Sequence, residues 1–108
     1  MNADWTWQAR GVSVRVNLSR TRNDADAVAV MVHETVHAKE YMATVGQQRA
    51  LFRSVGLTGP QWGSADWSYH QQPSEKAARA AAVCLARYSD PRPHYSCATL
   101  SRILGALG

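Results

Sequence analysis

Apolar and polar residues alternate without a break from Val12 to Leu18, and this pattern predicts a strand with its apolar side chains on one face. A shorter strand is expected at Trp5–Gln8. Arg10-Gly11 is the expected turn of a hairpin between them, although the pair is not among the strong turn dipeptides. The polar side chains of the second strand would face water or line a groove.

After the polar residues 19–23 the apolar spacing becomes helical. A long helix is expected over Ala25–Val45, with Asn23 or Asp24 as its cap and Gly46 as its stop. Further helices are predicted from the apolar spacing and the stop signals, at Gln47–Val55, from Pro73 to about Tyr88, and at Ser96–Leu104. Together these elements predict an α+β fold in a single domain, residues 1–108, in which a small β-hairpin or sheet packs against three to four helices.

A long segment without clear periodicity, residues 57–73, separates the second and third predicted helices. Loops of this length in a small domain are usually functional or disordered. Trp62, Trp67 and Tyr69 argue against disorder, because large aromatic side chains tend to be packed. The segment is therefore expected either to cover the core or to contribute to a site.

Composition narrows the class of protein. The apolar share is 45% of 108 residues, and no apolar run reaches the length of a membrane span. The first residues hold neither a basic leader nor an apolar h-region, which favours a cytoplasmic location. The net charge of +4 fits either a solubilising surface or an acidic partner such as nucleic acid, but the arginines are dispersed.

Cys84 and Cys97 are the only cysteines and lack the C-x-x-C spacing of a structural zinc site. In a reducing cytosol they are expected to be free thiols, with Cys84 as a small buried residue. A disulfide joining the last two helices stays open as the alternative.

The sequence His33-Glu34-Thr35-Val36-His37 carries the strongest chemical signal in the chain. It reads H-E-x-x-H, and on a helix residues four apart share one face, so both imidazoles can reach one metal ion. Zinc is the expected metal, because histidine nitrogens suit it and a catalytic zinc site leaves one position open for water. Glu34 is placed to take a proton from that water. The alternative is a solvated helix face.

A catalytic zinc needs a third protein ligand. Once Glu34 is assigned as the base and Glu40 is set aside as too far along the same helix, Glu75 is the one glutamate left. It opens a helix that could pack against the first. The alternative is a carboxylate favoured there only by the helix dipole and by capping. His70, Asp66 and His94 are reserve ligands.

The H-E-x-x-H motif followed by Glu75-Lys76-Ala77-Ala78 on a second helix resembles the glutamate-zincins, or gluzincins, in their smallest bacterial and phage forms. It looks similar to the minimal peptidase cores of the anti-repressor and SprT-like metalloprotease families, over about residues 12–88. The resemblance implies a zincin-like core, with His33, His37 and Glu75 as zinc ligands and Glu34 as general base. It also implies that the strand before the helix binds an extended peptide by edge pairing.

The expected function is therefore zinc-dependent hydrolysis of a peptide or protein substrate, with a metal-activated water and a glutamate base. Tyr69 and His70, just before the glutamate helix, are the candidate substrate-binding and oxyanion-stabilising residues, and Tyr41 is a weaker candidate. Two alternatives remain: a catalytically idle module that binds zinc or protein, and a basic nucleic-acid-binding accessory domain. Retention of Glu34 favours the enzyme over the idle module.

Overall fold

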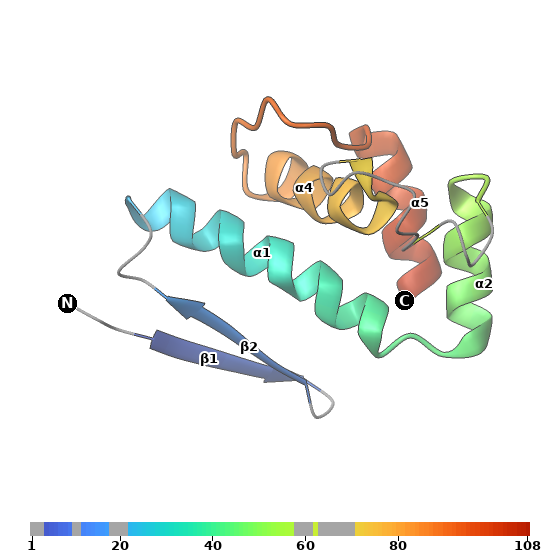
Figure 1. Ribbon diagram of the computed structural model, residues 1–108, viewed down its shortest axis with the longest axis horizontal. Helices are drawn as coiled ribbons and strands as arrows, with labels where there is room; N and C mark the ends of the chain where they lie inside the picture. The colour runs from blue at the N-terminus through green and yellow to red at the C-terminus, as the bar shows by residue number, and fades with distance from the viewer. Residues whose placement is uncertain (1–3, 10–11, 18–21, 58–61, 63–70) are drawn as a thin grey trace.

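The computed structural model describes residues 4–9, 12–17, 22–57, 62 and 71–108 of the chain (Figure 1). Two strands come first, β1 (Asp4–Ala9) and β2 (Val12–Asn17). The described helices follow in the order α1 (Asp24–Tyr41), α2 (Val45–Ser54), α4 (Pro73–Leu85) and α5 (Cys97–Leu107). The predicted turn at Arg10-Gly11 lies outside the described residues.

The two strands form an antiparallel ribbon in which Trp5 is opposite Val16 and Gln8 is opposite Ser13. The ribbon lies along one side of α1, and α4 lies along the other side (Figure 1). The ribbon is thus an extension beside the long helix, and α2 and α5 lie near the C-terminal end of α1 (Figure 1).

The predicted α+β fold class is wrong, because the body of the molecule is helical. The buried hydrophobic residues that the structure describes come from the four helices, together with Trp62. A ribbon of two strands does not form the sheet layer against which helices pack in an α+β domain, and such a ribbon is marginal on its own. Alternation in the sequence specifies strand conformation, but it does not specify how many strands join into a layer.

The first helix also ends earlier than predicted. Helix α1 stops at Tyr41, and α2 begins at Val45 with Gly46 inside its first turn. The reason is a capping box: the Thr44 hydroxyl accepts from the Gln47 backbone N–H, and the Gln47 side chain accepts from the Thr44 N–H. The T-x-x-Q spacing that announces this start is present in the sequence. This cap therefore overrides the glycine stop.

Helix α4 is the centre of the helical body. Its buried residues include a run of alanines that lie against both α1 and α5, namely Ala77, Ala78, Ala80 and Ala81. Small side chains let helix axes approach closely, and this brings the first turn of α4 beside the middle of α1. A second helix pair, α2 with α5, closes the core with larger apolar groups.

A disulfide joins Cys84, in the last turn of α4, to Cys97, the first residue of α5. The expectation of free thiols is therefore wrong. The Ser96 hydroxyl accepts from the Thr99 backbone N–H and starts α5 at Cys97. This start places Cys97 within bonding distance of the end of α4, a proximity that no local sequence pattern encodes.

Candidate metal centre

The two histidines of the H-E-x-x-H motif lie one turn apart on α1, in the part of the helix that packs against α4. Both are partly buried, and Glu75 is buried in the first turn of α4. A proline at the start of α4 fixes the backbone of that turn, which points the Glu75 side chain toward α1. The structure thus brings together His33, His37 and Glu75, which the sequence predicts as ligands.

The three ligand atoms form a nearly equilateral triangle. His33 Nε2 and His37 Nε2 are 3.2 Å apart, and Glu75 Oε2 lies 3.2 Å from the first and 3.1 Å from the second. Ligand atoms about 2.0–2.2 Å from a tetrahedral zinc ion would be about 3.3–3.6 Å from one another, slightly more than these distances. The donor set and its spacing therefore fit three corners of a zinc tetrahedron, with the fourth corner free.

Hydrogen bonding alone accounts poorly for the same triangle. His37 Nε2 contacts His33 Nε2 and both Glu75 oxygens, the nearer contacts being 3.1 Å. Each imidazole ring nitrogen carries at most one proton in either protonation state, so His37 Nε2 cannot donate to three acceptors with good geometry. A shared cation satisfies the lone pairs of all three groups at once.

The other ring nitrogen of His37 is held by two groups. Its Nδ1 lies 3.2 Å from the Ser74 hydroxyl and 3.5 Å from Glu40 Oε2, and the same hydroxyl donates to Glu40 Oε2 over 2.5 Å. A carboxylate on the distal nitrogen of a ligating histidine fixes its tautomer and ring orientation. Glu40, which sequence reasoning set aside as a ligand, therefore has a positioning role. Its spacing three residues after His37 is the signal that could have found it.

The pKa values of the two histidines are shifted in opposite directions. Burial lowers the pKa of His33, and the neighbouring Glu75 carboxylate only partly opposes this shift. Burial also lowers the pKa of His37, but hydrogen bonding and charge from Glu40, with the charge of Glu75, outweigh it and raise the pKa to about 9. A metal that binds here would replace the proton of His37.

Glu34 lies on the open side of the centre. With His33 it lines a cavity of about 430 Å³. The rest of the lining comes from Arg22 and the N-terminal half of α1, from Ala82 of α4, and from the segment that follows α4. Of the three residues of the ligand triangle, only His33 lines this cavity. Glu34 is partly exposed and takes no part in the ligand triangle.

The remaining predicted site residues divide into two groups. Tyr69, His70 and Asp66 lie outside the described residues. His94 is exposed, and its Nδ1 lies 3.1 Å from the Tyr95 carbonyl oxygen, so it is not part of the triangle. Tyr41 is largely exposed and lines a separate hollow beside His37 and Glu40. Of these residues, Tyr41 alone lies near the centre within the part of the chain that the structure describes.

Comparisons of the chain with protein-family models, with curated proteins and with solved structures find no match. The resemblance to the glutamate-zincins therefore stays a prediction from the motif residues of the sequence.

Proposed function

We propose that this protein is a zinc-dependent hydrolase of peptide bonds. In this proposal His33, His37 and Glu75 hold the metal and Glu34 is the general base. The observation that carries it is the convergence of three ligand atoms within 3.1–3.2 Å of one another, beside a cavity that Glu34 also lines. An idle zinc-binding module would need the triangle but would have no use for a carboxylate in the cavity wall.

A bound zinc ion would supply Lewis acidity, which makes water a better nucleophile near neutral pH and polarises a carbonyl. Glu34 follows His33 by one residue, about 100° round the helix, so its carboxylate faces the cavity beside the ligands. There it would accept the proton of the attacking water and return it to the leaving amine. Glu40 and Ser74 would keep the Nε2 lone pair of His37 directed at the ligand triangle.

Location forms part of the same proposal. Among the described residues, none of the helices is both long enough and apolar enough to cross a membrane. The Cys84–Cys97 disulfide fits an oxidising compartment, where such bonds persist. It opposes the cytoplasmic location expected from the sequence.

The test is to purify the protein from zinc-containing medium, measure its metal content, and assay cleavage of a mixed peptide library. We expect about one zinc per chain. Glu34→Gln should keep the zinc and the fold but lose roughly 100-fold or more in rate, because glutamine cannot accept the proton. Asp24→Asn, which removes an exposed carboxylate from the same helix, is the matched control and should cleave at the wild-type rate.

Two results would contradict the proposal. If the wild-type protein is folded but contains no zinc, the proposed metal centre is wrong. A Glu34→Gln protein that cleaves at the normal rate would place the base elsewhere, and one that loses its zinc would make Glu34 a ligand.

A further inference from the structure

The cavity beside Glu34 has an arginine on each of two walls. Arg22 precedes α1, and Arg92 belongs to the segment between α4 and α5. Each arginine is paired with an aspartate that lines the same cavity, Asp26 and Asp90 respectively. In both pairs the carboxylate is less exposed than the guanidinium that it contacts.

On the first wall, Asp26 Oδ2 accepts from Arg22 Nε at 2.9 Å and from the Arg22 backbone N–H at 3.1 Å. The Asp26 side chain is 14% exposed, whereas that of Arg22 is 79% exposed. Tyr88, from the opposite wall, also interacts with Arg22 and helps raise its pKa. The aspartate therefore orients the guanidinium, which still presents most of its surface to solvent at the cavity.

On the second wall, Arg92 Nη2 donates to Asp90 Oδ2 at 2.7 Å and Arg92 Nε donates to Asp90 Oδ1 at 2.9 Å. Asp90 is only 3% exposed and Arg92 is 46% exposed. The hydrogen bond to Arg92, with the charge of Arg79 nearby, holds the pKa of Asp90 down at about 2. The carboxylate thus stays ionised and keeps the Arg92 guanidinium in place.

The segment that carries Arg92 is itself fixed. Buried Arg79 donates from Nε to the Pro93 carbonyl oxygen at 2.7 Å, and the Tyr95 N–H donates to the Lys76 carbonyl oxygen at 3.3 Å. The Cys84–Cys97 disulfide closes the segment at its base. Arg92 therefore stands on a preorganised wall, so little ordering cost remains when a ligand binds.

We propose that this cavity selects peptides that carry a carboxylate close to the bond at the metal centre, with Arg22 and Arg92 as the groups that bind it. Arginine matches the planar geometry of a carboxylate and gives charge-assisted hydrogen bonds. The carboxylate is either an acidic side chain or the free end of the peptide, and both have the same chemistry. The inference builds on the proposed function, but substrate binding can be measured without hydrolysis.

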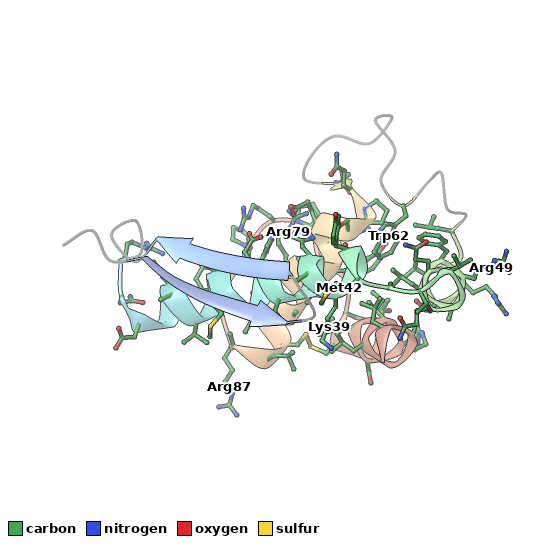
Figure 2. The ribbon with its side chains drawn as sticks, turned by 90° about the horizontal axis from the view of Figure 1, so that it is seen from below. Lys39, Met42, Arg49, Trp62, Arg79 and Arg87 are labelled. Atoms are coloured by element: carbon green, nitrogen blue, oxygen red, sulfur yellow. A yellow bond between two sulfur atoms is a disulfide. The ribbon has the colours of Figure 1, made fainter. Side chains whose placement is uncertain are left out.

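A nucleic acid fits the surface less well. A phosphate backbone is bound by a tract of basic groups, whereas the other exposed arginines of the described chain lie apart. In Figure 2 Arg49 projects from one end of the molecule and Arg87 from its lower side, both away from Arg79. Because Asp26, Asp90 and Glu34 line the same cavity, the two arginines would recognise a single carboxylate through directed hydrogen bonds and not through an excess of positive charge.

The experiment measures binding of three labelled heptapeptides to zinc-loaded Glu34→Gln protein by fluorescence anisotropy. One peptide has a central Glu and an amidated end, the second has Gln in its place and an amidated end, and the third has Gln and a free carboxyl end. We expect the first or the third to bind roughly tenfold more tightly than the second, which also identifies the source of the carboxylate.

Arg22→Gln and Arg92→Gln should each remove most of that preference, and Arg92→Lys, which keeps the charge over Asp90, should weaken it. Arg49→Gln and Arg102→Gln, in exposed arginines of α2 and α5, are the matched controls and should leave it unchanged. If Arg92→Gln does not fold, Arg22→Gln still decides, because Arg22 is at the surface.

Equal binding of the three peptides, no binding at about millimolar concentration, or a preference that survives in Arg22→Gln overturns the proposal. Competition by a single-stranded oligonucleotide alone, with no preference among the peptides, overturns it too. Protein that holds zinc and cleaves peptides without an acidic preference contradicts this inference only. Zinc-free protein that retains the acidic preference contradicts the proposed hydrolase and leaves the carboxylate site standing.

Discussion

The helix pairs α1–α4 and α2–α5 differ in the kind of side chain that packs between them. Between α1 and α4 the buried apolar groups are mostly the alanines of α4, with Val36 of α1, and the ionisable groups His33, His37 and Glu75 are in contact there. Between α2 and α5 the packing groups are apolar, namely Leu51, Leu100, Ile103 and Leu107. The first pair places charge where water is scarce, and the second removes hydrocarbon from water.

This difference indicates that α2 and α5 contribute more to folding stability, whereas α1 and α4 hold the candidate metal ligands. Buried ionisable groups lose hydration, and they contribute little net stability even when they are paired. Buried leucine and isoleucine each contribute roughly 1.5–3 kcal/mol. We therefore expect substitutions in the two pairs to separate cleanly, some acting on unfolding and others on the metal. Four predictions test this separation, from the largest effect to the smallest.

Ile103→Ala should lower the free energy of unfolding by about 2–5 kcal/mol, because it leaves a cavity at a fully buried position of α5. Urea unfolding of the metal-free protein measures this. The adjacent exposed Arg102→Ala is the control and should change it by less than about 0.5 kcal/mol. The zinc affinity of the folded Ile103 variant should match wild type, and a large loss there would mean that the two helix pairs are not independent.

Glu75→Ala should weaken zinc binding by more than about 100-fold, since losing a ligand costs more than losing a group behind one. Titration with a chelator measures the affinity. Asp24→Ala removes another first-turn carboxylate, from α1, and reports what the helix dipole alone is worth, roughly 0.3–1 kcal/mol of stability. If both variants keep their zinc, Glu75 is not a ligand and only stabilises the first turn of α4.

Glu40→Gln and Ser74→Ala should each weaken zinc binding by about 10- to 100-fold, because both groups hold the distal nitrogen of His37. The exposed neighbour Lys39→Ala is the control. Unchanged affinity in both variants would show that His37 is oriented by packing alone.

Zinc affinity should rise about tenfold per pH unit from pH 7 and level off near pH 9. The sign follows from His37, whose raised pKa of about 9 means that zinc must displace a proton at lower pH. The same shift stabilises the metal-free protein below pH 6.5, and that contribution is lost as the pH rises through 9. In Glu40→Gln the plateau should begin at a lower pH. A flat profile in wild type would contradict the protonated His37.

The sequence predicts the two candidate ligands on α1 directly, and it predicts the contributions of α4 only in part. His33 and His37 are related by the helical repeat, which any helix reproduces. Elimination among the three glutamates selects Glu75, and the structure places it beside the two histidines. The contact of Ser74 with His37 depends on how α4 sits on α1, and no spacing within one helix records that.

The fold class failed for a related reason. Alternation from Val12 to Leu18 describes one strand and its faces, whereas a class describes layers, which depend on long-range partners. The break between α1 and α2 is different, because the local T-x-x-Q spacing of Thr44 and Gln47 predicts a helix start there. The prediction of a stop at Gly46 neglects this capping pair. The disulfide again joins residues that the helix packing brings together.

The alanine row of α4 limits what mutation can do to this protein. Ala77, Ala78, Ala80 and Ala81 are all fully buried, so every added methyl group must push a neighbouring helix outward. Overpacking of this kind typically costs about 1–3 kcal/mol, and here it would also draw Glu75 away from the histidines. Over evolution these four positions are therefore expected to admit glycine or serine more readily than valine or leucine. The largest side chain tolerated at these four positions would be the one that still lets the Glu75 carboxylate contact the two histidines.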